Sequence, residues 1–412
     1  MGNLFKIAVR NLLRYKRRTL LTASLITIGV VFVLVFISVS GSFKNMMIGQ
    51  ITDSMLGHAQ VHRKGYVASI DNLPLNLNLG AGAAKRVEAV LNDRPELEAW
   101  SPRIKFGGMF SNFAETTNIR LNGVIPEKEF AAVPLLLSRI IDGEKGMKRG
   151  EILLPELLAK GMKVNVGDVV VIVATNKDGS VNGKQFKVGG ILQSVTGPGG
   201  RDGYIHFDDA VEVLRMEEPE VSEFAIRLKK FDGLHGFTST LNARLAQELN
   251  KEGKPIFEVH TWEQLSPFYN IAKMIDVMTF FIKLMLIAIV LISIMNVMIM
   301  AVYERIREIG TIAAIGTPPG KILSMFVIEG FCLGIVGAVI GNVAGIALVS
   351  IINMSRITFN FGQQQGLVLQ ATIKPADLFI ISLTVIIVSV IASLQPAFKA
   401  SRMEPIEALR HV

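Results

Sequence analysis

Four long runs without a charged residue dominate the hydrophobic pattern of the chain. They cover residues 19–43, 284–303, 330–355 and 378–398. A helix as long as the first run would rise about 37 Å at about 1.5 Å per residue, which exceeds a hydrocarbon core of about 30 Å. The pattern therefore predicts an α-helical membrane protein with four transmembrane helices.

These runs divide the chain into membrane and aqueous segments. A large α+β extracytoplasmic (periplasmic) domain is expected between the first and second helices. The expected segments are a cytoplasmic amphipathic helix 1–18, a transmembrane helix 19–43, the outer domain 44–272, a transmembrane helix 273–303, a coupling segment 304–321, a transmembrane helix 322–355, a short outer loop 356–376, a transmembrane helix 377–398 and a cytoplasmic tail 399–412.

The first run has an alternative interpretation as a cleaved signal peptide. Ser38-Val39-Ser40 imitates a small-residue cleavage site. The apolar region of a signal peptide is about 7–15 residues long, and this run is longer. We therefore expect a retained membrane anchor.

Lysine and arginine are concentrated on one side of this topology. Short flanks rich in these residues stay in the cytoplasm. The loop between the third and fourth spans has only Arg356 and Lys374. The basic flanks hold Lys6, Arg10, Arg14, Lys16, Arg17 and Arg18 before the first span, Arg305, Arg307 and Lys321 after the second, and Lys399, Arg402 and Arg410 after the fourth. Both termini and residues 304–321 are therefore expected in the cytoplasm, with residues 44–272 outside.

The N-terminal tail has the pattern of a basic amphipathic helix. Apolar residues recur at three- and four-residue spacing, at Leu4, Phe5, Ala8, Leu12 and Tyr15. Such a helix is suited to lie on the inner leaflet of the membrane. The alternative is a plain topology signal, because the positive-inside bias alone explains the charges.

Residues 44–272 alternate short strand patterns with helical ones, which predicts two lobes with a break after residue 110. Turn formers at Asp178-Gly179, at Asn182-Gly183 and in the loop 197–203 mark the joints. The expected strands are 58–62, 118–124, 168–173, 186–192 and 224–228, and the expected helices are 83–91, 156–159, 208–216 and 238–250.

The composition agrees with a membrane portion joined to a water-soluble one. Half of the residues are hydrophobic, the mean hydropathy is +0.43 and 19% are charged, which is too apolar for a soluble globular protein. The net charge of +8 is compatible with nucleic-acid binding. However, the basic residues cluster beside the apolar runs, which favours anionic membrane lipids as partners. No zinc spacing or aromatic-studded basic strand occurs, so no nucleic-acid partner is expected.

No catalytic motif is found in the outer domain. His58 and His62 would share one face of a strand or helix, but no carboxylate or cysteine lies at ligand spacing, and histidines are common on strand surfaces. Neither G-x-S-x-G nor H-E-x-x-H occurs. The single cysteine, Cys332, can form no intramolecular disulfide. We expect no catalytic residue, metal site or cofactor in this chain.

Residues 316–322 come closest to a phosphate-binding loop. A Walker A motif needs G-x-x-x-x-G-K-[ST]. Here the spacing is one residue short, Pro318 and Pro319 remove two amide donors, and Ile322 replaces the hydroxyl. Any ATPase, with its ATP and magnesium, is therefore expected to be a separate chain.

Residues 304–321 instead have the pattern of a short charged helix held between two spans. Gly316 can end this helix, Thr317 can cap the next one and Pro318-Pro319 can occupy its first turn. This favours contact with a cytoplasmic ATPase over a plain connecting loop. The apolar side would hold Ile306, Ile309, Ile312 or Ala313, and Ile315. The residues assigned to docking are Glu304, Arg305, Arg307, Glu308, Gly310, Gly316, Thr317 and Lys321.

Glycines in the third span predict close helix packing, within one subunit or across a dimer. They are Gly330, Gly334, Gly337, Gly341 and Gly345. Lys283 and Glu329 lie at the ends of spans, where snorkelling is the expected behaviour. Asn296 lies deeper and needs an interhelical partner.

Three segments, in the correct order and spacing, resemble the FtsX-like/MacB-like permeases of type VII (mechanotransmission) ABC transporters. They are AVRNLLRYKRRTLLT at 8–22, YERIREIGTIAAIGTPPGKIL at 303–323 and PAFKASRMEPIEALR at 396–410. The outer domain is similar only in size and in LLPELLAKGMKVNVGD at 153–168. GHAQVHRKGY at 57–66, and a sequence that begins at the permease and not at a fused ATPase, resemble lipoprotein-releasing permeases of the LolC/LolE kind.

This resemblance implies a dimer with a second permease copy or homologue in the bacterial inner membrane, served by cytoplasmic ATPases that dock on residues 304–321. It implies an outer domain that moves on ATP hydrolysis and releases lipoprotein or another hydrophobic cargo, with a periplasmic carrier or adaptor as a further partner. One alternative is a MacB-like exporter of peptides or drugs that works with an adaptor. Another is a signalling or scaffold permease that regulates cell-wall hydrolases, whose outer domain would be smaller.

Overall fold

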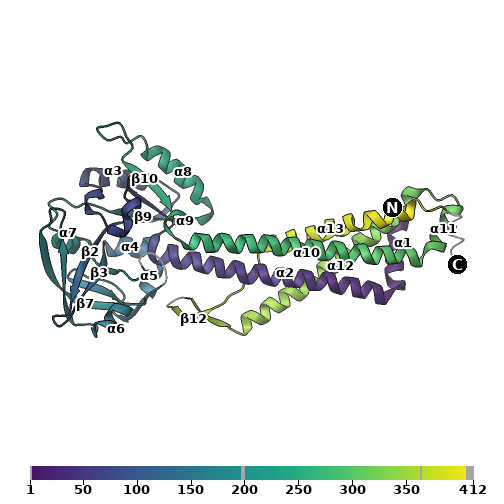
Figure 1. Ribbon diagram of the computed structural model, residues 1–412, viewed down its shortest axis with the longest axis horizontal. Helices are drawn as coiled ribbons and strands as arrows, with labels where there is room; N and C mark the ends of the chain where they lie inside the picture. The colour runs from purple at the N-terminus through teal and green to yellow at the C-terminus, as the bar shows by residue number, and fades with distance from the viewer. Residues whose placement is uncertain (1, 196–199, 362–363, 405–412) are drawn as a thin grey trace. The chain divides into compact units, whose positions relative to one another are not determined.

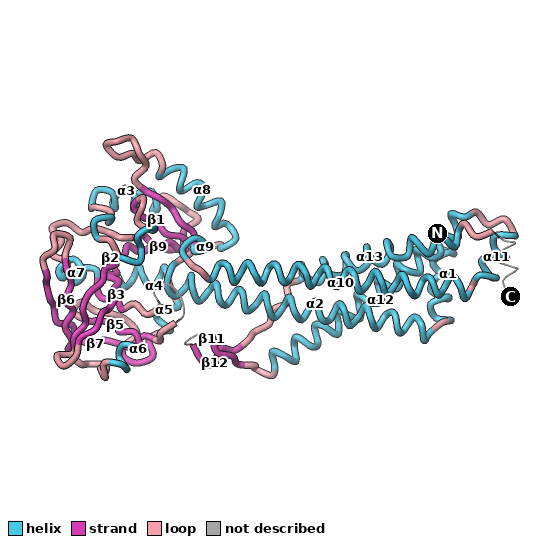
Figure 2. The backbone as a smooth tube through the Cα atoms, viewed as in Figure 1, coloured by secondary structure: helices cyan, strands magenta, loops and turns pink. Residues whose placement is uncertain are grey.

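The computed structural model describes residues 2–195, 200–361 and 364–404. The chain divides into two compact units. Unit 1 comprises residues 1–44, 273–358 and 368–412, and unit 2 comprises residues 45–272 and 359–367. Unit 1 consists of helices, whereas unit 2 contains a large sheet covered by short helices (Figures 1 and 2).

Four helices in the described residues are long and apolar enough to cross a membrane, so the predicted four spans are confirmed. Each helix extends beyond its charge-free run, and Lys283 lies inside the second of these helices. The reason is that a helix ends where its backbone conformation changes, and not where its apolar residues stop. The helices that lie wholly or mostly in unit 1 are α1 (Gly2–Arg14), α2 (Lys16–Ile51), α10 (Phe268–Glu304), α11 (Ile306–Ala314), α12 (Pro319–Met354) and α13 (Pro375–Ser401). The expected outer loop 356–376 contains strands β11 (Thr358–Phe361) and β12 (Gln364–Val368).

The helices of unit 1 share one hydrophobic core. Its fully buried members include Ile26, Val30, Val290, Ile294, Phe326 and Val385. The expected N-terminal helix is present as α1, and Leu12 packs against Cys332 and Leu333 of α12. Ile7 and Leu13 of α1 stay exposed. The N-terminal helix is therefore anchored in the protein by one apolar side, and other apolar residues remain for a membrane surface.

Unit 2 is built on a ten-stranded, mainly antiparallel sheet. The order is β10-β1-β9-β2-β3-β8-β5-β7-β4, and β6 pairs with both β2 and β7. Six strands, β2, β3, β8, β5, β7 and β6, thus close into a ring, and β9, β1 and β10 extend the sheet from β2. The strands are β1 (Ala59–Arg63), β2 (Leu97–Ser111), β3 (Thr116–Val124), β4 (Ile140–Gly143), β5 (Glu151–Pro155), β6 (Val169–Thr175), β7 (Val181–Leu192), β8 (Gly203–His206), β9 (Glu223–Leu228) and β10 (Phe257–Thr261).

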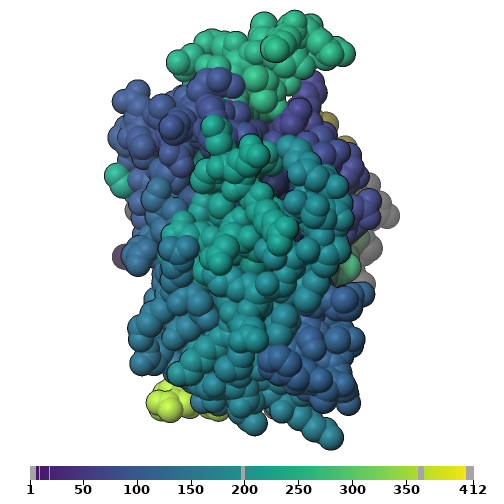
Figure 3. Space-filling view, turned by 90° about the vertical axis from the view of Figure 1, so that its left-hand side faces the viewer, coloured from purple at the N-terminus to yellow at the C-terminus, as the bar shows by residue number. Residues whose placement is uncertain are grey.

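Short helices connect and cover these strands. In the face of unit 2 seen in Figure 3, the segment around α8, drawn in green, lies at one edge. The helices are η1 (Thr52–Leu56), η2 (Val67–Asn72), η3 (Leu75–Leu77), α3 (Ala81–Asn92), α4 (Pro126–Ala132), α5 (Leu135–Ser138), α6 (Glu156–Gly161), α7 (Phe207–Val213), η4 (Phe231–Gly233), α8 (Leu234–Leu245) and α9 (Trp262–Leu265).

The long strand β2 joins both parts of the sheet. Its residues 97–103 pair with β9, whereas residues 103–111 pair with β3. The two parts that the sequence suggested as lobes thus share one 15-residue strand. The sequence pattern missed β2 because Pro102 and Gly107-Gly108 interrupt its alternation.

The prediction of a turn at Asn182-Gly183 is wrong. Both residues lie inside β7, opposite Ala174 and Val173 of β6. The neighbouring Asp178-Gly179 makes the turn between these strands, with Gly179 at φ +84°. Of the expected loop 197–203, residues 197–199 lie outside the described residues.

Candidate functional site

The segment between α10 and α12 is a short helix bounded by two backbone breaks. Arg305 leaves the helical conformation, with φ −111° and ψ 15°, before α11 begins. At the other end, Gly316 adopts φ +91°. The amide of Gly316 donates to the carbonyl of Ala313 at 3.0 Å, and that of Thr317 donates to Ile312 at 3.2 Å. This Schellman motif satisfies two terminal carbonyls, and the predicted helix end at Gly316 is confirmed.

The start of α12 differs from the prediction. Pro318 is the N-cap, with φ −64° and ψ 144°, and Pro319 occupies the first helical position without a side-chain cap bond. Thr317 is therefore not the cap. Prolines begin this helix instead, because their fixed φ suits the first turn. An N–H at the first helical position has no partner within the helix, so its absence costs no hydrogen bond. Residues 316–322 are thus a helix end followed by a helix start.

The residues assigned to docking differ in exposure. Those with exposed side chains or surfaces are Glu304, Arg307, Glu308, Gly316 and Lys321, and Thr317 is half-buried. Arg305 and Gly310 are buried. These two residues therefore do not contribute to the exposed surface of the segment.

The guanidinium of Arg305 is enclosed by protein. Its Nη1 donates to Oε1 of Glu329 on α12 at 3.2 Å, and the two side chains are 3% and 1% exposed. The guanidinium carbon lies 4.6 Å from the centroid of the Tyr15 ring. The expectation that Glu329 snorkels to the surface is wrong, because an internal cation partners its carboxylate.

The sequence pattern placed Ile315, and either Ile312 or Ala313, on the apolar side of this segment. Ala313 packs against the core, whereas the two isoleucines are exposed. Ile312 is 37% exposed and Ile315 is 80% exposed. α11 ends before Ile315, so this residue no longer follows the helical periodicity that buries Ile309. Together with Arg307 and Glu308, they give α11 an outer face of mixed charge and large apolar groups, which we call the α11 face. Exposed apolar side chains rimmed by polar ones mark protein contact surfaces.

α1 lies at the same end of unit 1 as α11 (Figure 1). Arg14 Nη1 lies 3.4 Å from Glu308 Oε1, and both side chains are more than half exposed. Such an exposed ion pair contributes about 0–1 kcal/mol. It therefore leaves Glu308 available for another contact at little cost.

The five glycines of α12 that the sequence predicted to pack closely face helices of the same chain. A β-carbon at Gly330 would lie 2.6 Å from Ser393 Cβ, and one at Gly334 would lie 2.6 Å from Ser389 Oγ, both on α13. The other three glycines face α2. A β-carbon at Gly337 would lie 2.5 Å from the side chain of Ile26, one at Gly341 would lie 2.6 Å from Val30, and one at Gly345 would lie 2.8 Å from Leu34. Real β-carbons do not approach this closely, so glycine at these positions lets α13 and α2 pack against α12 within one subunit.

Asn296 has no interhelical partner within the described part of the chain. Its side chain is exposed on α10 and makes no hydrogen bond to another described residue. Ile292 and Ile299, on the same side of the helix, are also exposed. The interhelical partner expected from the sequence is therefore not found among the described residues.

Unit 2 encloses a cluster of buried charges where the two parts of the sheet meet. Arg103 of β2 contacts Glu129 of α4 at 2.7 Å and Glu223 of β9 at 2.9 Å, and all three side chains are at most 2% exposed. Lys105 and His62 lie 3.6 Å from Glu223. Burial alone would raise the pKa of Glu223, but Lys105, His62 and Arg103 together hold this pKa well below its usual range.

The histidines His58 and His62 are buried, not on the strand surface as the sequence suggested. His58 Nε2 lies 3.5 Å from Asp53, and its Nδ1 accepts a hydrogen bond from the amide of Leu228. The carboxylate near His58 lies five residues before it in the chain, whereas Glu223, which lies near His62, is distant in sequence. No group of three or more metal-ligating side chains is found in the described residues.

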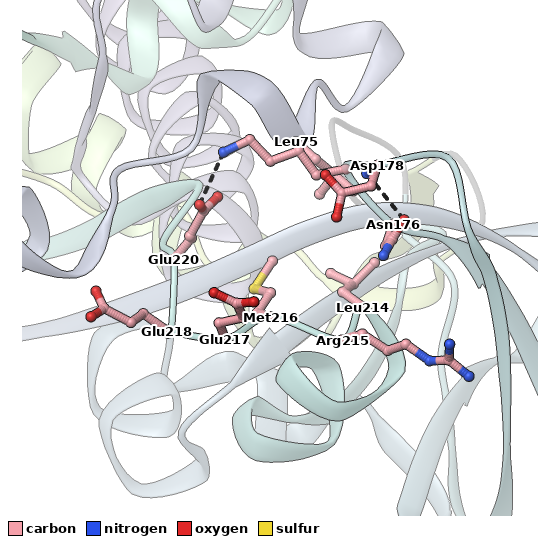
Figure 4. Close-up of a pocket in the computed structure, with 10 residues that line it drawn as sticks. Leu75, Asn176, Asp178, Leu214, Arg215, Met216, Glu217, Glu218 and Glu220 are labelled. Carbon is pink, nitrogen blue, oxygen red and sulfur yellow. Dashed lines mark hydrogen bonds and ion pairs between the residues drawn. The ribbon is translucent and has the colours of Figure 1, made fainter.

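Unit 2 also has surface hollows. One of about 510 Å³ is lined by charged residues, among them Glu217 and Glu218, and the ion pair of Glu220 with Lys177 at 3.0 Å closes one side (Figure 4). Another of about 570 Å³ lies beside Leu228 and Phe237. Neither brings a nucleophile together with a base, so neither has the arrangement of a hydrolytic site.

Two family models match the chain. The model described as "FtsX-like permease C-terminal" matches residues 280–405, and the "MacB-like periplasmic core domain" matches residues 19–234. The second match covers more than half of the chain. The two matches together include the candidate site and most of unit 2.

Curated relatives are similar over both units. The lipoprotein-releasing system transmembrane protein LolC of Neisseria meningitidis is 24% identical over 420 residues, covering 95% of this chain and 94% of that protein. LolC of Xylella fastidiosa is 25% identical over 71% of this chain and 72% of its own length. The macrolide export ATP-binding/permease protein MacB of Nitrobacter winogradskyi is 33% identical over 29% of this chain and 17% of its own length.

Proposed function

The chain belongs to the FtsX-like/MacB-like family of type VII ABC transporter permeases, and on this premise we propose that it couples ATP hydrolysis by a separate ATPase to release of a hydrophobic cargo. The α11 face would receive the ATPase, and unit 2 would act on the cargo. The observation that carries the proposal is this face, which exposes Arg307, Glu308 and Ile315 on a helix anchored at both ends. An anchored helix passes a displacement on to its neighbours, whereas a mobile loop absorbs it.

The charge pattern supports a cytoplasmic ATPase. Basic residues gather in α1, near α11 and after α13, which favours a cytoplasmic position for this end under the positive-inside rule. ATP and magnesium would be bound by the partner. The chain would lie in the bacterial inner membrane with both termini in the cytoplasm and unit 2 in the periplasm.

A lipoprotein is the cargo that we favour. Two relatives matching at least 71% of the chain are lipoprotein-releasing system proteins, whereas the similarity to a macrolide exporter covers 29%. The test reconstitutes the permease with its ATPase in proteoliposomes that hold a triacylated lipoprotein, and measures ATP-dependent release to the aqueous phase. ATP-dependent transport of a macrolide without lipoprotein release would instead support a drug exporter working with an adaptor.

Replacing Arg307 or Glu308 by alanine is expected to lower the amount of ATPase that co-purifies with the permease about tenfold. Truncating an important interface side chain costs about 1–2 kcal/mol, which is about tenfold in affinity. The measurement is quantitative co-purification in mild detergent. Lys374→Ala is the matched control, because Lys374 is an exposed cation at the start of α13, distant in sequence from α11. Undiminished co-purification of both variants would contradict the docking role.

Replacing Asn296 by leucine is expected to weaken the association of two permease copies about 3- to 30-fold. An amide carries both donors and acceptors, so two copies related by a two-fold axis can pair their Asn296 side chains. Such hydrogen bonds between membrane helices are worth about 0.6–2 kcal/mol. The measurement is energy transfer between labelled permeases at increasing lipid dilution. Ile292→Leu, one turn away on the same face, is the control, and equal association of Asn296→Leu and wild type would exclude this contact.

A further inference from the structure

Arg305 occupies a special place at the candidate site, because it belongs to the docking segment in sequence but not to its accessible surface. The helical conformation breaks at this residue, and α11 starts directly after it. Its side chain nevertheless turns inward and is 3% exposed. A residue so placed cannot contact an ATPase directly, yet any displacement of α11 must move it.

The buried guanidinium touches two other parts of unit 1. Nη1 binds Glu329 on α12 at 3.2 Å, and the cation lies 4.6 Å from the ring of Tyr15. Tyr15 is the residue between α1 and α2. Three chain segments that are distant in sequence therefore meet on one side chain.

We infer that Arg305 is a positioning residue that couples the docking helix α11 to α12 and to the α1–α2 junction through its ion pair with Glu329. This inference rests on the function proposed above. Separating a buried ion pair leaves an uncompensated charge in the protein interior, which is strongly unfavourable. α11, α12 and the α1–α2 junction therefore move together when the ATPase displaces α11.

The contacts of α12 extend this coupling to the other spans. Gly330 follows Glu329 directly, and its missing side chain lets Ser393 of α13 approach. Further along α12, Gly337 admits Ile26 of α2 in the same way. A shift of Glu329 is therefore passed to α13 and α2 by direct contact and not by a flexible linker.

The exposed ion pair between Arg14 and Glu308 joins the same segments at the surface but is a weak substitute. It is 3.4 Å long and open to water on both sides. Screened pairs of this kind contribute little. The buried pair, not the exposed one, thus carries the coupling.

The first test uses the permease alone. Arg305→Gln and Glu329→Gln are compared with wild type by amide hydrogen exchange of the full chain in mild detergent. We expect exchange in α11 to accelerate about tenfold in both variants, and to return toward wild type in the exchanged pair Arg305→Glu with Glu329→Arg. Arg14→Gln, which removes the exposed pair and the 5.8 Å contact of Arg14 with the Tyr15 ring but keeps the buried pair, should leave exchange unchanged. Unchanged α11 exchange in both single variants would overturn the inference, whether or not an ATPase binds.

The second test uses the complex with the ATPase. We expect both single variants to co-purify with as much ATPase as wild type and to keep the same KM for ATP. The kcat for ATP hydrolysis should fall about five- to tenfold, which corresponds to the low end of coupling between distant sites. The double variant Arg305→Gln with Glu329→Gln should be no worse than either single one, because they remove one interaction.

The outcomes separate the two claims. Loss of ATPase co-purification in Arg305→Gln would place Arg305 in the docking surface and overturn its positioning role. A normal kcat for ATP hydrolysis in both single variants would also overturn the positioning role. Failure of wild type to bind any ATPase would instead refute the proposed function, and hydrogen exchange of the permease alone would then still decide the inference.

Discussion

Replacing Glu223 by glutamine is expected to lower the free energy of unfolding of unit 2 by about 3–5 kcal/mol, the usual cost of breaking a buried ion pair. Glu223 is fully buried and lies between Arg103 and Lys105, which are at most 7% exposed. Glutamine has a similar volume but no negative charge. Arg103 would then keep only Glu129, and Lys105 would lose the carboxylate that it contacts.

The measurement is urea unfolding of the full chain in mild detergent, followed by tryptophan fluorescence. The chain has two tryptophans, Trp100 and Trp262, and both belong to unit 2, so the signal reports this unit alone. Trp100 also contacts Phe224, the neighbour of Glu223 on β9. Glu218→Gln makes the same chemical change at an exposed position and should cost less than about 0.5 kcal/mol. A loss in Glu223→Gln no larger than in this control would contradict the structure of the cluster.

The same carboxylate predicts how the stability of unit 2 depends on pH. The pKa of Glu223 is lower in the folded state than the value of about 4.3 of an unfolded glutamate. Its stabilising contribution is therefore fully present above that value and is lost as the pH falls toward the folded-state pKa. We expect the urea concentration at the unfolding midpoint of wild type to decrease as the pH is lowered from about 5 to about 3. The midpoint of Glu223→Gln should change less over this range. Parallel curves for the two proteins would refute this assignment.

Replacing Gly337 by alanine is expected to destabilise unit 1 by about 1–3 kcal/mol, the usual cost of overpacking a core. The new β-carbon would lie 2.5 Å from Ile26 on α2, so the two helices have to separate or shift. Larger side chains at this position would destabilise unit 1 more. Because both helices are apolar spans, their separation would also weaken the coupling that the α12 contacts provide.

A double-mutant cycle gives this prediction a strict test. Ile26→Ala alone leaves a cavity, but combined with Gly337→Ala it removes Cγ2, the atom nearest to the new methyl group, and leaves Cβ at 2.8 Å, so it relieves part of the clash. The double variant should therefore be more stable than the sum of the two single effects predicts. Unfolding by SDS, followed by helical circular dichroism, measures each free energy. Gly320→Ala, near the start of the same helix with no atom within 4 Å, is the control and should be close to neutral. If the two changes in the free energy of unfolding simply add, the contact between Gly337 and Ile26 is contradicted.

Much of the membrane architecture could be read from local sequence features. Charge-free runs of sufficient length are a one-dimensional property, and they predicted all four spans. Gly316 marked a helix end correctly, because the left-handed backbone conformation there favours glycine whatever surrounds it. Strand patterns such as 118–124 and 224–228 were confirmed as β3 and β9, because β-branched and aromatic residues favour strands locally.

Features that depend on contacts between distant residues could not be read in this way. Arg305 was assigned to docking as one of the charged residues of segment 304–321, and only Glu329 on another helix explains its burial. His62 was expected on a strand surface, yet Glu223, which is distant in sequence, lies 3.6 Å from it inside the fold. β2 was missed because its one proline and its two glycines lower the strand propensity, whereas its pairing with three other strands stabilises it.

By itself, the sequence determined the number of spans, the inserted outer domain, the helix end at Gly316 and the glycine positions of the third span, because each depends on local hydrophobicity or backbone preference. Only the tertiary structure decided that these glycines face α2 and α13, that Arg305 is paired inside and that Ile315 is exposed. The physical reason is that a side chain's partner and burial depend on which helices pack together, and that packing brings together residues far apart in the chain.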